Sequence, residues 1–276
     1  MNGLQRSMDE TRGMGTFEHE TAVVERGDHW TTHLHGAWSI GDNPNGGYAL
    51  TPVLRVLGGL AGHPDPLSVT TQFLRPAAGD TDGEVRAEVV RVGRTTGVAR
   101  GTLIQRDTER LVTTAVFGDL SESAGSGPEL APDPIELPPP EACVDRRDLA
   151  QGVELPILSR VDVRIDPAHA EAGTADRAVV AGWIRLADGA PPSTLALVVF
   201  ADAFPPSLYP LVGRVGWVPT VELTVHVRRR PAPGWIRAVF ECDDLHDGRM
   251  IESGTLWDSN GAVVARSRQL GIHLTR

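Results

Sequence analysis

The chain contains no lysine, and all 26 of its basic residues are arginine. This absence excludes a pyridoxal Schiff base, a P-loop with its phosphate-binding lysine and a lysine general base. Cysteine is nearly absent as well. Cys143 and Cys242 are too far apart in the sequence to match the ligand spacing of a zinc site. We therefore expect two free thiols in a reducing cytoplasm.

Positive charge is scarce, since 26 basic residues stand against 36 acidic ones and the formal net charge is −10. Proteins that bind nucleic acid through its phosphates are usually basic, so no nucleic-acid partner is expected. No apolar run approaches the roughly 20 residues that cross a bilayer. Residues 1–16 are polar and do not resemble a signal peptide. These patterns predict a cytoplasmic protein without a membrane partner.

Apolar residues make up 41% of the 276, which is enough for a substantial core. Residues 45–62 predict a helix, with Asn43 or Asn45 as its cap, although Pro52 weakens the pattern. Residues 193–208 predict a second helix, bent near Pro205 and Pro206.

Alternating apolar and polar residues predict two groups of strands with no helix between most neighbours, so the sheet should be antiparallel. The expected strands are 67–75, 84–92, 98–106 and 111–117 in the first half, and 161–165, 178–186, 221–228, 235–243, 249–257 and 263–273 in the second half.

The two halves repeat one pattern. Three short matches recur at nearly one offset, of 153 to 155 residues, and in the same order. They are Gly101–Leu103 with Gly254–Leu256, Arg75-Pro76 with Arg230-Pro231, and Gly118 with Gly271. Six prolines between residues 121 and 141 indicate a linker between the copies. We expect a first unit at 17–120, a proline-rich linker at 121–150 and a second unit at 151–276.

A helix with a long antiparallel sheet, present twice, resembles the double hotdog fold. Five short motifs are similar to those of the acyl-CoA thioesterase II-like family. They are Gly46-Gly47, Phe73–Pro76, Phe200–Asp202, Thr220–Glu222 and Arg268–Gly271. The resemblance implies an α+β fold with two long antiparallel sheets, each wrapped around a central helix. It implies that the halves join edge to edge in one continuous sheet, and that the chain forms a homo-oligomer.

The resemblance also implies an activity in lipid metabolism, the hydrolysis of an acyl-CoA thioester to free acid and CoA by an activated water. No cofactor or metal is needed. The family's catalytic Asp, Ser or Thr, and Gln fall on Asp202, Thr220 and Gln269. Glu222 and Leu223 replace the Asp and His that are common in the family, and Thr224 is a second candidate for the hydroxyl.

The chemistry of these residues suits that role. Asp202 follows an apolar run, so partial burial would raise its pKa and let it act as a general base on water. The Gln269 amide can donate to a developing oxyanion. At the repeat offset, the counterparts of Asp202 and Gln269 lie near residues 50 and 116, and the polar set is missing there. We therefore expect one active site per chain, in the second half.

Several alternatives stay open. The chain could be an acyl-CoA-binding protein without turnover. It could also be a hotdog enoyl-CoA hydratase, although residues 39–44 lack the histidine of that signature. Gly46 and Gly47 either favour an anion at a helix start or allow close packing. The run 228–230 of three arginines either binds CoA phosphates or is a solvated strand end. His29, His33 and His35 are expected to be ordinary strand residues, without a metal.

Overall fold

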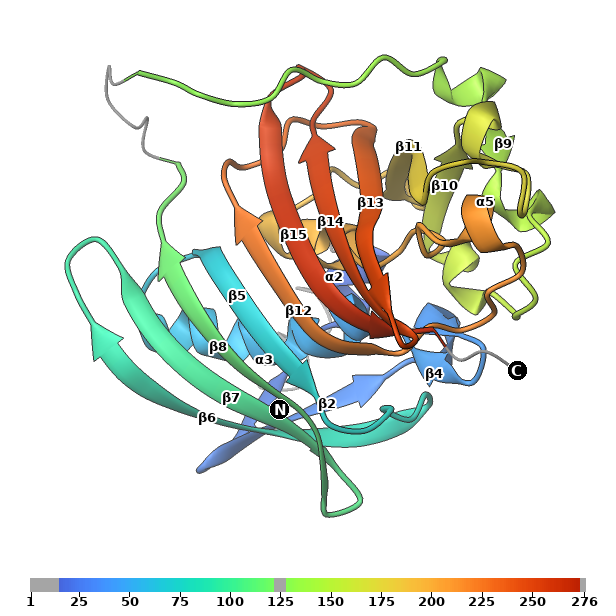
Figure 1. Ribbon diagram of the computed structural model, residues 1–276. Coiled ribbons are helices and arrows are strands. Elements are labelled where there is room, and N and C mark those ends of the chain that lie inside the picture. Colours follow the sequence, from blue (N-terminus) through green and yellow to red (C-terminus); the bar gives the residue numbers. More distant parts are fainter. Residues whose placement is uncertain (1–14, 122–127, 274–276) are drawn as a thin grey trace.

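The computed structural model describes residues 15–121 and 128–273 (Figure 1). Apart from residues 15 and 16, the segment for which we expected no signal peptide lies outside this range. No helix in the described ranges is long and apolar enough to cross a membrane.

A single antiparallel sheet of 13 strands forms the body of the molecule. Its strands are β1 (Val24–Arg26), β2 (His29–Leu34), β5 (Asp65–Phe73), β6 (Thr81–Val92), β7 (Gly97–Gln105), β8 (Thr108–Gly118), β9 (Val144–Asp145), β10 (Val161–Ile165), β11 (Val179–Leu186), β12 (Thr220–Val227), β13 (Ile236–His246), β14 (Arg249–Trp257) and β15 (Val263–Ile272). The short strands β3 (Ser39–Ile40) and β4 (Asn43–Pro44) form a separate hairpin.

The strand order is β1-β2-β6-β7-β8-β5-β12-β15-β14-β13-β11-β10-β9. The two halves therefore join edge to edge through β5 and β12, and the strands form one continuous sheet rather than two separate ones. Thr70 pairs with Thr224 at this seam, 154 residues away, and their hydroxyls are 3.1 Å apart. The sequence separation of 154 residues lies within the repeat offset of 153 to 155, so matching positions of the two halves meet at this seam.

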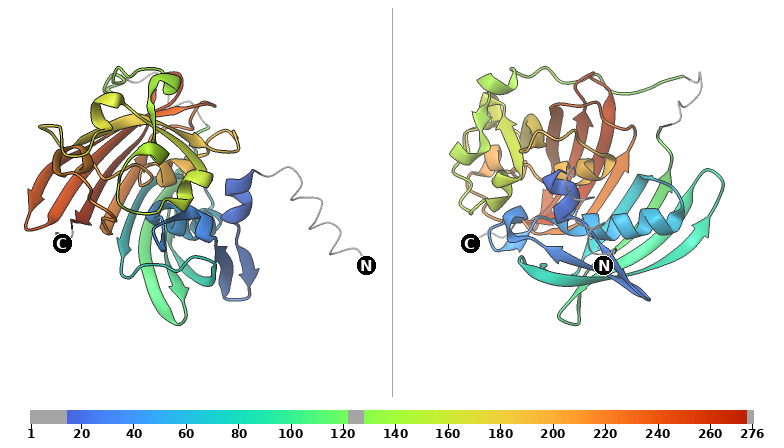
Figure 2. Two further views of the ribbon diagram at one scale, coloured as in Figure 1. Left: turned by 90° about the vertical axis from the view of Figure 1, so that its right-hand side faces the viewer. Right: turned by 180° about the vertical axis from the view of Figure 1, so that it is seen from behind.

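Two α-helices follow the pattern of the repeat. The first, α3 (Gly46–Ala61), begins at its cap Asn45 and ends at Gly62, which has φ 71°. It continues through Pro52, because most of its side chains are buried against the sheet and this packing outweighs one lost hydrogen bond. The second, α4 (Thr194–Phe200), contacts α3. Figure 2 shows both helices on the same side of the sheet.

The prediction of one bent helix over 193–208 is wrong. The helix α4 ends at Phe200, and turns lead through Pro205 and Pro206 to the four-residue α5 (Tyr209–Val212). Two adjacent prolines supply no amide hydrogens, so the helical hydrogen bonds cannot continue across them. Smaller helical turns are α2 (Thr16–Glu20), η2 (Gly36–Trp38), η3 (Pro140–Ala142), η4 (Arg146–Asp148), η5 (Pro156–Ser159) and η6 (Pro167–His169).

The proline-rich segment is extended where the structure describes it. Residues 128–139 have no regular structure and cross the ends of β15, β14 and β13 (Figure 1). Two tryptophan side chains hold the segment on the sheet, since Trp257 Nε1 donates to the Pro132 carbonyl at 3.1 Å and Trp183 Nε1 donates to the Pro138 carbonyl at 2.8 Å.

Candidate active site

Asp202 lies in the turn that follows α4, two residues beyond its last helical residue. Its amide donates to the Val199 carbonyl at 3.0 Å, which holds the turn closed. Its carboxylate oxygen Oδ2 accepts from Asn45 Nδ2 at 2.9 Å and from the Gly47 amide at 3.1 Å. The first half of the chain thus supplies two donors to a carboxylate of the second half.

Asn45 was expected only as a helix cap, and it does cap α3, since its Oδ1 accepts from the Tyr48 amide at 2.9 Å. Its Nδ2 also donates to the Asp202 carbonyl at 2.6 Å. Because the cap fixes the oxygen end of the Asn45 amide, its nitrogen end points at Asp202. Asn45 therefore joins the start of α3 to the turn after α4.

The two glycines that begin α3 fit both roles considered above, close packing and an anion at the helix start. A Cβ atom on Gly47 would lie 2.6 Å from the Val198 carbonyl oxygen, so glycine allows the close contact of α3 with α4. A Cβ atom on Gly46 would lie 2.9 Å from Asp202 Oδ2. The anion at this helix start is the Asp202 carboxylate itself, which the helix dipole favours.

The structure brings Thr220 and Gln269 to Asp202. The hydroxyl of Thr220, the first residue of β12, donates to Gln269 Oε1 at 3.0 Å and lies 3.5 Å from Asp202 Oδ1. Gln269 is on the neighbouring strand β15. The alternative hydroxyl, Thr224, instead contacts Thr70 and donates to Glu222 Oε1 at 2.6 Å. Thr224 does not line the cavity described below.

Glu252, on β14, is a member of the site that the sequence reasoning missed. It is buried, its Oε2 accepts from the Ser207 amide at 2.7 Å, and its Oε1 accepts from Gln269 Nε2. A signal was present, because the period of two along β14 puts Glu252 on the same buried face as Met250 and Leu256. Burying a carboxylate costs free energy unless it is hydrogen-bonded, so a glutamate on such a face indicates a specific role.

The two carboxylates share a low-dielectric environment. The pKa of Asp202 is raised from 3.8 to about 6, chiefly by burial. The hydrogen bond from the Gly47 amide opposes this rise, and the charge of Glu252 contributes to it. Burial also raises the pKa of Glu252, against the hydrogen bonds from Ser207 and Gln269. Asp202 is therefore a base that titrates close to neutral pH.

A buried arginine lies behind the turn. Arg146 donates to the Ala203 carbonyl and, at 2.9 Å, to Gln151 Oε1. Burial lowers the pKa of Arg146 to about 9, and the charge of Asp202 opposes that change. Arg146 stands in the predicted linker 121–150, and the sequence analysis did not single it out.

A cavity of about 240 Å³ opens beside these residues, and both halves of the chain line it. Asp202, Thr220, Glu252 and Gln269 form one polar wall. Apolar side chains form much of the rest, among them Ile40, Phe73, Leu111, Phe204, Phe240 and Met250. A thioester with an apolar acyl chain could place its carbonyl at the polar wall and its chain among the apolar residues.

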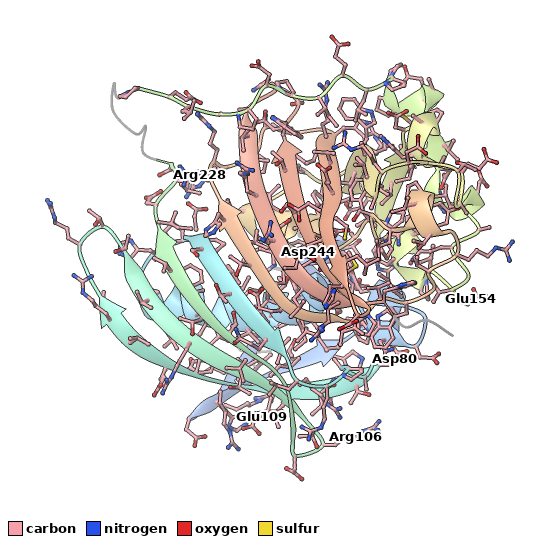
Figure 3. The ribbon with its side chains drawn as sticks, viewed as in Figure 1. Asp80, Arg106, Glu109, Glu154, Arg228 and Asp244 are labelled. Carbon is pink, nitrogen blue, oxygen red and sulfur yellow. The ribbon has the colours of Figure 1, made fainter. Side chains whose placement is uncertain are left out.

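The arginine run 228–230 is not brought to this cavity. Arg228 (Figure 3) follows the end of β12, whereas Thr220 is the first residue of that strand. Arg230 forms ion pairs with Asp65 at 2.8 Å and with Asp119 at 3.3 Å, and Arg229 pairs with Glu129. These contacts fit a structural role for the run.

The histidines also lie elsewhere. His33 Nδ1 is 2.6 Å from Asp82 Oδ1, and His29 Nδ1 is 3.0 Å from Asp28 Oδ1. Among residues 15–121 and 128–273, no group of three or more His, Cys, Asp or Glu side chains is placed to hold a metal ion.

Comparison with known proteins gives one consistent result. Residues 34–118 match the model of the acyl-CoA thioesterase N-terminal domain, and residues 140–273 match that of the C-terminal domain. A solved structure of a candidate thioesterase II from Thermobifida fusca is 31% identical, covers 95% of this chain and 99% of its own, and has a TM-score of 0.85.

Two more relatives carry no assigned function. A protein with a hot dog fold from Alicyclobacillus acidocaldarius is 24% identical, with a TM-score of 0.80 over 95% of this chain and 99% of its own. An uncharacterised protein of Mycobacterium tuberculosis is 27% identical over 262 residues, which are 87% of this chain and 89% of that protein. The chain therefore belongs to the acyl-CoA thioesterase II-like family of hotdog-fold proteins.

Proposed function

We propose that this protein hydrolyses acyl-CoA thioesters to a free acid and CoA with an activated water. One observation carries the proposal. A carboxylate whose pKa is raised to about 6 stands beside a Thr–Gln pair on the polar wall of a largely apolar cavity. The match of both halves to acyl-CoA thioesterase domains supports the same activity.

The hydrogen bonds of Asp202 suggest where the water binds. Oδ2 already accepts from Asn45 and Gly47. In the part of the chain that the structure describes, the hydrogen bond found at Oδ1 is the long 3.5 Å contact with Thr220. Oδ1 is therefore the oxygen left to hold a water and take its proton. At neutral pH a carboxylate with this pKa is ionised and more basic than an ordinary aspartate.

Hydrolysis then follows in two steps. The water oxygen attacks the thioester carbonyl carbon while Asp202 takes a proton, which gives a tetrahedral oxyanion. The C–S bond then breaks, the acid is released, and the CoA sulfur takes the proton back from Asp202. Gln269 Nε2 carries two hydrogens, and among the described residues one acceptor is found for them, Glu252. The second is available to the oxyanion.

The finer parts of the proposal concern the whole chain. We propose that residues 17–120 and 151–276 are two hotdog units, each with its half of the sheet around its own helix. A homo-oligomer is supported by three exposed valines on β6, Val89, Val90 and Val92. A cytoplasmic location agrees with Cys143 and Cys242, which are both free thiols.

Thiol release from a panel of acyl-CoAs tests the proposal. We expect steady release by the native protein, with a rate that depends on acyl length. Asp202→Asn keeps the shape and removes the base, so kcat should fall by about 10²–10⁴. The matched control is Asp244→Asn, an exposed aspartate on β13 (Figure 3), which should keep full activity. Tight acyl-CoA binding without thiol release would instead make the chain a binding protein.

A further inference from the structure

We propose that Glu252 is a positioning residue for this hydrolysis, which holds the Gln269 side-chain amide with its oxygen toward Thr220. The inference rests on the proposed function and assigns a role to a residue outside the Asp–Thr–Gln set.

The orientation of Gln269 depends on its partners, because the two ends of an amide have nearly the same shape. The hydrogen bonds from Ser207 and Gln269 favour the ionised form of Glu252 against the effect of burial. In that form the carboxylate only accepts hydrogen bonds, so it selects the nitrogen end of Gln269. The carboxylate cannot turn away easily, since the Ser207 amide holds its other oxygen at 2.7 Å and only 4% of Glu252 is exposed.

This orientation determines what Thr220 can do. With Oε1 of Gln269 facing it at 3.0 Å, the hydroxyl gives its single proton to Gln269 rather than to Asp202 at 3.5 Å. Asp202 Oδ1 is then free to take a proton from water, and the lone pairs of Thr220 can accept the second hydrogen of that water. With the amide reversed, Nε2 would donate to Thr220, and the hydroxyl would donate to Asp202 and compete with the water.

Glu252 also places a second negative charge near Asp202. Within residues 15–121 and 128–273, the groups found to bond to the two carboxylates are uncharged. They are Asn45, Gly47 and Thr220 at Asp202, and Ser207 and Gln269 at Glu252. Other charged or titratable groups also lie near the two carboxylates. Arg146 lies buried behind Asp202, Arg75 and Arg110 line the cavity, and Cys242 pairs with Glu252 from β13. The charge of Glu252 adds to the rise in the pKa of Asp202, so its removal should lower that pKa.

A purely structural role makes a different prediction. If Glu252 only ties the Ser207 turn to β14, its replacement should lower stability and leave the pH dependence of turnover unchanged. The pH–rate profile and the split between kcat and KM therefore separate the two roles.

The test is Glu252→Gln, which keeps the size and removes the charge. We expect kcat to fall about 10- to 100-fold, as for other partners that orient a reacting group, with KM nearly unchanged. The acid limb of the kcat profile should move to lower pH. Glu25→Gln, at an exposed position on β1, removes the same charge and should change neither quantity. An unchanged kcat and acid limb in Glu252→Gln would overturn the proposal.

A double-mutant cycle tests whether Glu252 acts through Gln269. In a Gln269→Ala background, Glu252→Gln should have little further effect on kcat, and a fully multiplicative loss would overturn the positioning role. If Glu252→Gln does not fold, Glu252→Asp replaces it. That variant keeps the charge and shortens the reach, so kcat should fall while the acid limb stays in place, and a native kcat would count against the proposal.

A measurement without turnover separates this inference from the proposed function. The Asp202 carboxyl can be titrated by carbon NMR in labelled protein. Its pKa should fall in Glu252→Gln even if the native protein releases no thiol. An unchanged Asp202 titration would overturn the charge effect, whereas absence of thiol release from every acyl-CoA would overturn only the proposed function.

Discussion

The role proposed for Asp202, that of a general base, conflicts with the stability of the folded protein. Burial makes it a better base because the ionised form is poorly solvated, and the same poor solvation penalises the folded protein at neutral pH. The donors Asn45 and Gly47 limit this penalty without removing it. Functional sites commonly carry such a cost.

Asp202→Asn should therefore stabilise the protein at neutral pH. The folded-state pKa of about 6 lies above the ordinary 3.8, so the folded state binds the proton more tightly than the unfolded state. The stability that this proton gives is complete below about pH 4 and is lost as the pH rises through about 6. The variant should gain roughly 1–3 kcal/mol at about pH 8.

Denaturant unfolding of both proteins at about pH 4 and pH 8 measures this effect. The advantage of the variant should disappear at the lower pH. An equal difference at both pH values would mean that ionisation of Asp202 does not cause it. Asp244→Asn serves again as the control for an exposed carboxylate.

The two threonines on β12 provide a second comparison at this scale. Thr220→Val removes the hydroxyl between Asp202 and Gln269, and kcat should fall by about 10². Thr224→Val removes a hydroxyl at the β5–β12 seam, where its partners are Thr70 and Glu222. It should lower stability slightly and leave kcat unchanged. Kinetics of the two variants decide which hydroxyl serves the reaction, and a loss confined to Thr224→Val would contradict the site geometry.

Sequence reasoning reached some of these residues and not others. Asp202, Thr220 and Gln269 could be found because each stands in a short motif at a fixed place in the repeat. Glu252 could have been found from the burial period of β14. The second bond of Asn45 and the position of Arg146 could not, because each depends on how a distant segment meets the turn after α4. No local pattern records a contact between segments more than 50 residues apart.

The contact between α3 and α4 positions the site at the element scale. The two helices meet where Gly47 faces the backbone of Val198 and Val199, and the turn that carries Asp202 follows at once. A change in the helix separation would move the carboxylate away from the Gly47 amide. The glycine therefore affects both packing and the electrostatics of the site.

Gly47→Ala should lower both stability and activity. The added Cβ would lie 2.6 Å from one backbone atom and 2.8 Å from another, so the helices must separate, at a cost of about 1–3 kcal/mol. Gly59→Ala is the control on the same helix, because nothing lies within 4 Å of its Cβ. It should stabilise the protein by about 0.5–1 kcal/mol. Thermal unfolding and kcat are measured for both variants. Equal changes in the two variants would show that the close contact of Gly47 with α4 determines neither stability nor activity.

Most strands could be predicted to within a few residues, because one face of each is buried and the period of two is clear. The sequence patterns placed strands at 161–165 and 249–257, and both agree with β10 and β14. The helix over 193–208 was extended too far because the apolar pattern continues into the turn around Phe204. Apart from the strand expected around His29 and His33, the elements between residues 16 and 40 were missed, because they are short and depend on contacts with distant segments.

At the scale of the whole molecule, two arginines at matching positions of the repeat have different surroundings. Arg75 follows β5 and Arg230 follows β12, at the repeat offset of 155. Arg230 is neutralised by Asp65, which lies at the start of β5, and by Asp119. Arg75 lines the cavity and is exposed, and no ion pair to it is found in the described part of the chain. One copy of the arginine therefore stabilises the fold, while the other is available to an anion.

We expect Arg75 to bind the phosphates of CoA at the mouth of the cavity. Arg75→Ala should raise KM for an acyl-CoA about threefold to tenfold, because an exposed charge pair contributes roughly 1 kcal/mol, and kcat should change little. The effect should weaken with salt and vanish with an acyl-pantetheine, which has the thioester and lacks the phosphates. Arg230→Ala is the matched variant. It leaves the Asp65 carboxylate without its partner and should lower the melting temperature without a selective rise in KM for acyl-CoA. If Arg75→Ala raises KM equally for both substrates, Arg75 contacts the acyl or pantetheine part, and the free copy of the arginine has another use.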